Sequence, residues 1–315
     1  MADPIVVDNT ILSMTAKCST LAVTRGVLGY TAKEESANLR AGSACHACWA
    51  TYFRGGTADE ALAALAACDD FEVWAGEHVE ATDRLAFGNV SRIMRRWIET
   101  HPRERLPFVI DADKVEVYFE SPLTDEGDIV YCGIMDALGQ YNGAYYNIEN
   151  KTTGRLDQSW LRAQRMSAQI SGYHWLAEQY LGAPIAGTFI NVQELSRLPS
   201  DSSRKCKEHG VSYSECGALH SKAEIGIDSR TPTRLAEWKK TAIHLAKKYR
   251  ELLRYNDLGM IQKVRMQGTT NNSCRWCAFS EWCYMERDSG YAASNFTYDP
   301  WAPRERALAR VGGSE

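Results

Sequence analysis

The sequence predicts an α/β protein in which a mixed central sheet is flanked by helices. Three observations indicate this class. Helical patterns fill most of the first hundred residues, three strand-like segments then follow with no helix between them, and a helix, a strand and a long amphipathic helix come after. Segments in this order pack as a sheet covered by helices. Apolar residues make up 44% of the 315 residues, which is enough to bury a core of this kind.

The helices are predicted from apolar periodicity and from the residues at their ends. Gly55-Gly56 ends the first helical pattern, Thr57 is a good N-cap for the second, and Gly182 ends the fourth. The long last helix carries an apolar stripe with helical spacing, which predicts packing against the core. The predicted helices cover 39–53, 57–68, 82–100, 159–181 and 231–255.

The strands are predicted from short β-rich runs that are bounded by turn residues. Breaks at 121–127 and 139–143 separate the first three of them. The predicted strands cover 109–119, 128–138, 144–151, 184–192 and 223–228.

The elements suggest three parts along the chain. We expect an N-terminal segment at 1–38, a core at 39–256 and a C-terminal segment at 257–315, which holds a cysteine cluster and an irregular tail. A polar insertion is expected inside the core at about 197–222.

Composition limits the compartment and the binding partners. The sequence contains no apolar run long enough for a membrane span, and its acidic first residues do not resemble a signal peptide, so a cytoplasmic protein without membrane attachment is expected. The net charge of −4 means that any nucleic-acid binding would have to use a local basic groove.

Two carboxylates and a lysine are predicted to meet on neighbouring strands. Glu149 and Lys151 alternate along one strand and therefore point the same way. If the preceding strand forms a hairpin with this one, Asp136 lies beside Glu149. Two carboxylates suit Mg²⁺, which favours oxygen ligands and keeps several waters, and a lysine can orient or activate an attacking water. The alternative is a salt-bridged surface strand.

With two further motifs, the sequence resembles the PD-(D/E)XK nucleases, and in particular their RecB-like branch. Asp136 and Glu149-Asn150-Lys151 match the two core motifs of that superfamily. Gly42 to His46 looks like the G-x-x-x-H element of an early helix, and Gln169 to Tyr173 looks like the Q-x-x-x-Y element of a later one. The resemblance implies a restriction-endonuclease-like core.

The resemblance also implies roles for these residues. Asp136, Glu149 and the main-chain carbonyl of Asn150 would bind Mg²⁺ or Mn²⁺, with His46 as a further metal ligand. Lys151 would position or activate the attacking water. The remaining members, Gln169 and Tyr173, would contact the DNA backbone or support the site. Glu116 and Glu120, on the preceding strand, compete as a secondary acidic member.

Three cysteines follow the core with the spacing C-x2-C-x5-C, at Cys274, Cys277 and Cys283. Zinc sites generally use paired C-x2-C motifs, whereas a triplet with one distant cysteine suits an iron–sulfur cluster held by four thiolates. The AddB nuclease domain and a CRISPR-associated nuclease family show the same arrangement, with one cysteine before the core. By that resemblance Cys18 would complete the site for a 4Fe–4S cluster, which would join the N-terminal and C-terminal segments.

Other cysteines leave alternatives open. Cys45 and Cys48 compete with Cys18 as the fourth ligand, and zinc or free thiols compete with the cluster. A further run, Cys206-x2-His209-x6-Cys216-x3-His220, could form a small zinc knuckle, although its spacing matches no established zinc motif. The alternative is a mobile loop that contacts DNA, and the sequence leaves zinc binding there open.

The resemblance implies a function in DNA end processing. We expect a metal-dependent exonuclease that acts on DNA in recombination or repair, with partner proteins from those processes and an origin in a phage or mobile element. The alternatives are an endonuclease on the same fold and a non-catalytic iron–sulfur subunit of a recombination complex. Strand polarity, strand preference and oligomeric state stay open, and an oligomer is compatible with the resemblance.

Overall fold

The computed structural model describes residues 3–33, 36–80, 83–195, 205–212, 216, 220–266 and 273–312. The chain forms two compact units. Unit 1 contains residues 1–34, 118–134 and 231–315, and unit 2 contains residues 35–117 and 135–230. In the part of the chain that is described, no helix combines the length and apolar character of a membrane span.

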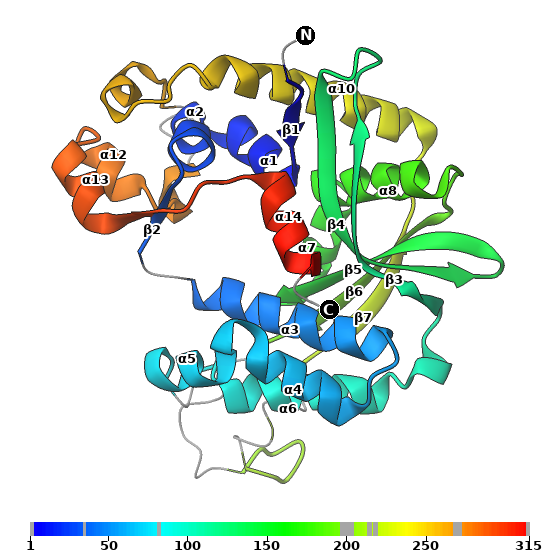
Figure 1. The fold of residues 1–315 in the computed structure, drawn as a ribbon. Helices are drawn as coiled ribbons and strands as arrows, with labels where there is room; N and C mark the ends of the chain where they lie inside the picture. Colours follow the sequence, from blue (N-terminus) through cyan, green and yellow to red (C-terminus); the bar gives the residue numbers. More distant parts are fainter. Residues whose placement is uncertain are drawn as a thin grey trace. The chain divides into compact units, whose positions relative to one another are not determined.

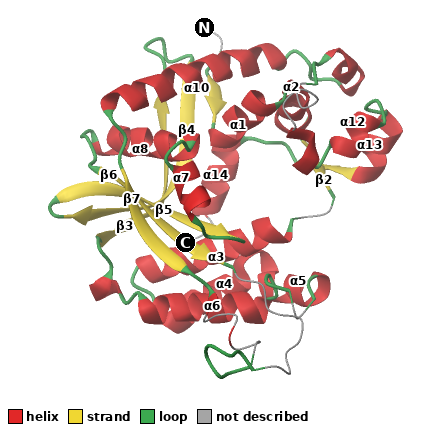
Figure 2. Cartoon of the chain, turned by 180° about the vertical axis from the view of Figure 1, so that it is seen from behind, coloured by secondary structure: helices red, strands yellow, loops and turns green. Residues whose placement is uncertain are grey.

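Unit 2 contains most of the sheet and the helices that flank it (Figure 1). The helices α3, α4 and α6 cover one face of the strands β5 to β7, and α8 lies on the other face (Figures 1 and 2). Its helices are α3 (Ala37–Phe53), α4 (Ala58–Ala67), α5 (Phe71–His78), α6 (Phe87–Thr100), α7 (Gln158–Gln164) and α8 (Ala168–Leu181). Its strands are β5 (Ala144–Thr153), β6 (Gly187–Glu194), β7 (Ala223–Asp228) and parts of β3 (Val109–Pro122) and β4 (Ile129–Tyr141).

The sheet is mixed, as the sequence predicts. Its strands follow the order β1-β4-β5-β6-β7, and β3 also pairs with β4. The pairs β4–β5 and β6–β7 are antiparallel, whereas β5–β6 and β1–β4 are parallel. The hairpin between β4 and β5 turns at Asn142 and Gly143, which both have positive φ. Two such residues form the turn that matches the twist of paired strands.

The core of unit 2 packs around the aromatic side chains of α3 and α6. Trp49 and Trp97 are fully buried and meet edge to face, with 5.8 Å between ring centroids. Their neighbours include Ile148 of β5 and Phe189 of β6, so the helices cover the apolar face of the sheet. Thr57 caps α4 through a complete capping box, as its sequence predicts.

One predicted helix is divided in two. The segment predicted as 159–181 forms α7 and α8, because Ser167 interrupts it and accepts a hydrogen bond from the backbone N–H of Ile170. Ser167 is thus the N-cap of a new helix.

Unit 1 joins the two ends of the chain. The helix α1 packs against α10, and β2 pairs antiparallel with β8 near the other end of the sequence. The elements of this unit, apart from its parts of β3 and β4, are β1 (Ile5–Val7), α1 (Asn9–Lys17), α2 (Ser19–Leu21), a π-helical turn (Ala22–Val27), β2 (Tyr30–Ala32), α10 (Pro232–Leu252), α12 (Ser280–Tyr284), α13 (Ser289–Asn295), β8 (Phe296–Tyr298) and α14 (Pro303–Gly312). The prediction of an irregular tail was therefore wrong.

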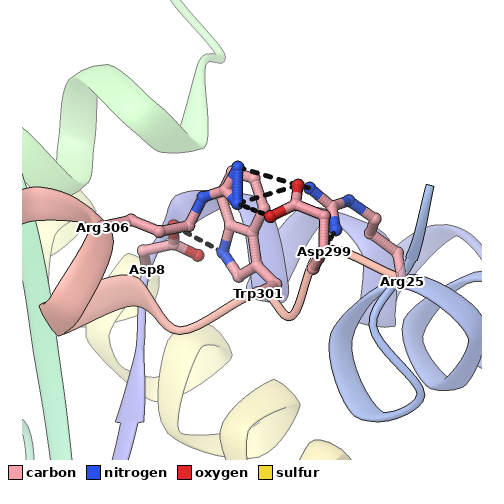
Figure 3. A network of polar contacts seen from close by, with 5 residues as sticks. All are labelled: Asp8, Arg25, Asp299, Trp301 and Arg306. Carbon is pink, nitrogen blue, oxygen red and sulfur yellow. Dashed lines mark hydrogen bonds and ion pairs between the residues drawn. The ribbon is translucent and has the colours of Figure 1, made fainter. Parts of the chain in front are cut away.

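A polar network supports this junction within unit 1 (Figure 3). The carboxylate of Asp299 lies between the guanidinium groups of Arg25 and Arg306. The Trp301 ring lies against both cations, at 4.9 Å and 4.5 Å, and its indole N–H donates to Asp8 over 3.1 Å. Residues at the two ends of the chain therefore share hydrogen bonds and cation–π contacts.

Candidate metal and nuclease site

The hairpin β4–β5 brings the two predicted core motifs together in unit 2. Its register pairs Ala137 with Ile148. Asp136 precedes Ala137 on β4 and Glu149 follows Ile148 on β5, so the two carboxylates come from neighbouring positions on the two strands. Both carboxylates are buried, with 6% and 1% of their surface exposed. A buried carboxylate must have hydrogen bonds or a neighbouring positive charge to remain ionised.

Asp136 has two such partners. The backbone N–H of Asn150 donates to Asp136 Oδ2 over 2.7 Å, and His46 Nδ1 lies 3.2 Å from Asp136 Oδ1. His46 comes from α3, one turn after Gly42. A Cβ atom at Gly42 would lie 3.5 Å from the Thr152 hydroxyl of β5, so the helix passes close to the strand at this point.

Glu149 and Lys151 point the same way and form an ion pair, as their alternation predicts. Lys151 Nζ lies 2.6 Å from Glu149 Oε1 and donates to Gln169 Oε1 on α8 over 2.8 Å. Tyr173 lies one turn beyond Gln169 on α8 and is half-buried. The ammonium group of Lys151 therefore lies between the carboxylate oxygen of Glu149 and the amide oxygen of Gln169, where α8 contacts β5.

Glu116 is a further acidic member of the site. Its carboxylate, His46 and Asp136 offer ligand atoms that all lie within 4.8 Å of one another. Glu116 has a φ of 55°, which is rare for a residue with a side chain and is typical of a strained position inside a strand. The sequence pattern raised Glu116 only as a secondary candidate beside Glu120, because alternation along a strand does not reveal such a backbone distortion.

Glu120 lies in unit 1 and has another partner. Its carboxylate accepts two hydrogen bonds of 2.8 Å from the Arg304 guanidinium, and Tyr118 donates to it over 2.5 Å. These bonds lower the pKa of Glu120. Among the described residues, Glu120 thus belongs to a structural ion pair, and Glu116 is the acidic residue that β3 contributes to the site.

The electrostatics of the site keep Asp136 ionised and oppose the ionisation of Glu149. Burial raises the pKa of Asp136, but His46, Lys151 and the Asn150 N–H outweigh it, and the net shift is downward. Burial also raises the pKa of Glu149, and there Lys151 does not offset it. Burial lowers the pKa of His46, but the contact with Asp136 outweighs this effect and the net shift is upward.

The residues of this site fit a divalent cation. A bound cation would favour the ionised form of Glu149, whose ionisation burial opposes by raising its pKa. Glu149 Oε2 is buried and has no hydrogen-bond partner among the described residues. Such an atom costs free energy unless a cation or water satisfies it. Oxygen ligands with one imidazole suit Mg²⁺ or Mn²⁺.

One residue near the site was not predicted. Asn191 of β6 is fully buried and donates from Nδ2 to Asn150 Oδ1 over 2.7 Å. This bond orients the side chain of Asn150, the residue whose backbone N–H donates to Asp136. The sequence offers one weak signal for it, which is an amide among the apolar residues Phe189, Ile190 and Val192 of this strand.

The predicted cluster cysteines lie together in unit 1. A cavity of ≈ 240 Å³ is lined by Cys18, which follows α1, and by Cys274, Cys277 and Cys283 from the C-terminal segment. This volume is far above the roughly 10–15 Å³ that one water molecule requires. The rival ligands Cys45 and Cys48 are instead fully buried in the apolar core of unit 2.

Comparison with known proteins identifies the family of the chain. The family model of the PD-(D/E)XK nuclease superfamily matches residues 10–284, which include both core motifs and all four cysteines at the cavity. No curated protein matches the chain. The extent of the family match shows that this chain belongs to the PD-(D/E)XK nuclease superfamily.

Proposed function

We propose that this protein is a metal-dependent DNA exonuclease of the RecB-like branch, which acts on DNA ends in recombination or repair. The observation that carries the proposal is the proximity of two sets of residues on neighbouring strands. His46, Glu116 and Asp136 offer ligand atoms within 4.8 Å of one another, and Lys151 forms an ion pair with the buried Glu149 on the strand paired with that of Asp136. An ordinary surface salt bridge would not bring the carboxylates of Asp136 and Glu149 into the interior.

The chain's own residues would divide the work as follows. Asp136, Glu149, His46 and the Asn150 carbonyl would hold Mg²⁺ or Mn²⁺. A divalent cation there would offset phosphate charge and acidify the attacking water. Lys151, whose ammonium group is positioned by Glu149 and Gln169, would orient that water and stabilise developing negative charge.

The residues of α8 would position this lysine. Gln169 accepts a hydrogen bond from Lys151 and so limits the directions in which its ammonium group points. Tyr173, one turn further on, would contact the DNA backbone or support the site. Glu116, which lies in the same ligand group as His46, would complete the acidic set.

We also propose that the four cysteines of unit 1 hold a 4Fe–4S cluster. The cavity that they line supports this. A tetrahedral zinc ion would require sulfur atoms about 3.8 Å apart. Among the described residues, no three of these cysteines form a group whose ligand atoms lie within 4.8 Å of one another, which favours the wider spacing of a cluster over one zinc ion. A cluster would link the N-terminal and C-terminal segments.

The activity is tested with end-labelled linear DNA and closed circular DNA, each with Mg²⁺, with Mn²⁺ or with EDTA. We expect metal-dependent loss of linear DNA only, and a decrease of about 10²–10⁴-fold in Lys151→Ala. Lys240→Ala, at an exposed lysine of α10, is the matched control and should retain full activity.

Other results would change the proposal. Cleavage of circles would identify an endonuclease on the same site. Full activity of Lys151→Ala would exclude this site as the centre of hydrolysis. No activity from folded, metal-supplied protein would favour a non-catalytic DNA-binding subunit or the need for a partner protein.

The cluster is tested by iron analysis of protein purified without oxygen. We expect iron in the wild type and in Lys151→Ala, and loss of iron and solubility in Cys283→Ser. Cys68→Ser, outside the cavity, is the control and should keep its iron. A soluble, active Cys283→Ser protein without iron would contradict a structural role, and iron-free wild type would contradict the cluster itself.

A further inference from the structure

Two cysteines and two histidines converge in the connection between β6 and β7, apart from both sites described above. They are Cys206, His209, Cys216 and His220, and their ligand atoms all lie within 4.8 Å of one another. The sequence spacing of the four matches no established zinc motif and left zinc binding open, and the structure brings all four ligand atoms together.

The distances within this cluster agree with a single tetrahedral ion. Bonds of about 2.3 Å to sulfur and 2.0–2.1 Å to nitrogen place a sulfur and a nitrogen about 3.5 Å apart at the tetrahedral angle. Cys206 Sγ lies 3.6 Å from His209 Nδ1 and 3.3 Å from His220 Nε2. Cys216 Sγ lies 3.2 Å from His209 Nδ1.

The backbone around Cys206 holds its sulfur toward the other ligands. Lys205 and Ser212 form an isolated β-bridge, and the Gly210 N–H donates to the Cys206 carbonyl over 2.7 Å. Gly210 has a φ of 69°, which lets the chain reverse directly after His209. The backbone N–H groups of Glu208 and His209 also donate to the Cys206 sulfur.

Burial in this segment is also unusual. Cys206 and Cys216 are 4% and 0% exposed, although neither belongs to the main apolar cluster of unit 2 and the surrounding sequence is polar. His209 and His220 are exposed and close over the two sulfurs from outside. A small polar segment has little apolar surface to bury, and such segments are commonly held together by a metal ion or a disulfide.

The end of the segment is attached to the sheet beside His220. Ser221 donates to the Glu194 carbonyl at the end of β6, and Gln193 Nε2 donates to Ser221 Oγ over 2.8 Å. The last ligand is therefore placed by the strands, and an ion bound to all four residues would tie the hairpin of 205–212 to the start of β7.

We propose that Cys206, His209, Cys216 and His220 form a structural zinc site. Two sulfur and two nitrogen ligands in tetrahedral arrangement are typical of Zn²⁺. A two-iron cluster with two cysteines and two histidines would place the sulfurs and the nitrogens on different iron atoms, whereas here sulfur and nitrogen lie 3.2–3.6 Å apart and all four ligand atoms lie within 4.8 Å of one another. A disulfide would give no reason for two imidazoles to contact the sulfurs.

The test is metal analysis of the full chain after expression with added zinc. We expect about one zinc per chain, and its loss in the double variant Cys206→Ser/Cys216→Ser. Lys207→Ser, between two of the ligands, and Cys68→Ser, outside both cysteine groups, should both keep this zinc. Replacement by Co²⁺ should give the visible absorption of tetrahedral cobalt with thiolate ligands.

A conservative variant separates loss of ligand from loss of folding. His209→Cys keeps four zinc ligands and should retain the metal, whereas His209→Ala should weaken its binding. Absence of zinc from folded wild type, or zinc that persists in the double cysteine variant, would overturn the proposal. A Cys206–Cys216 disulfide found by mass spectrometry in metal-free protein would overturn it too. None of these readouts depends on nuclease activity.

Discussion

His174 of α8 should make unit 2 less stable in mild acid. It is 1% exposed, and its Nδ1 atom has no hydrogen-bond partner among the described residues. Burial, with a contribution from the Arg230 charge, lowers the pKa of His174 to about 4. Glu178 does not reverse this, because its Oε1 atom lies 3.6 Å from His174 Nε2, which is beyond good hydrogen-bond length.

The sign and size of the effect follow from these two pKa values. Below pH 6.5 the unfolded chain binds a proton at His174 that the folded protein does not, so unfolding becomes more favourable as pH falls. The loss begins near the unfolded pKa and is complete below the folded pKa of about 4. At about 1.36 kcal/mol per pKa unit, roughly 2 kcal/mol is lost by pH 5 and at most about 3 kcal/mol in total.

Two measurements check this reasoning. Histidine NMR resonances followed with pH, and assigned with His174→Gln, should show no titration of His174 above about pH 5. Urea unfolding of the wild type should weaken between pH 8 and pH 5 by about 2 kcal/mol more than that of the variant. A His174 resonance that titrates near 6.5, or equal pH slopes for both proteins, would refute the argument.

Four further substitutions test the packing within the two units by urea unfolding. Gly139→Ala should lower the free energy of unfolding by about 1–3 kcal/mol, because a Cβ there would lie 2.8 Å from a backbone carbonyl oxygen of β3. Gly88→Ala in α6 meets no atom within 4 Å and should raise the free energy of unfolding by up to about 1 kcal/mol. The reverse order would show that the close approach of β3 does not exclude a side chain at Gly139. Asn191→Ala should lower the free energy of unfolding by about 1–3 kcal/mol, because the buried Asn150 Oδ1 loses its hydrogen-bond donor. An unchanged free energy of unfolding would indicate that water replaces the bond. Asp299→Asn should lower the free energy of unfolding by less than about 1 kcal/mol, since the ion pair between Asp299 and Arg25 is partly exposed. A larger loss would mean that the polar network around Asp299 is stronger than a surface ion pair.

The parts of the fold that could be predicted are those with local signals. Thr57 and Glu60 cap α4 by contacts three residues apart, and Asn142-Gly143 sets the hairpin by its own backbone preference. That hairpin, together with the alternation of Glu149 and Lys151, was sufficient to anticipate how the two core motifs meet.

The parts that could not be predicted depend on distant partners. The strand β1 pairs with β4, more than a hundred residues away, and β2 pairs with β8 near the other end of the chain. Three-residue strands carry too little periodicity to be recognised before their partners are known. The positive φ of Glu116 and the convergence of His220 on Cys206 are likewise set by tertiary structure, and neither has a signature in residue spacing.

The pairing of β2 with β8 has a consequence for the order in which the protein is made. Translation delivers residues 30–32 long before their partner strand at 296–298. The segments of unit 2 are complete once residue 230 has been synthesised, so this unit can fold before β2 has its partner strand. A chain truncated before β8 would therefore have a formed carboxylate site and an unpaired β2, an edge open to aggregation and proteolysis.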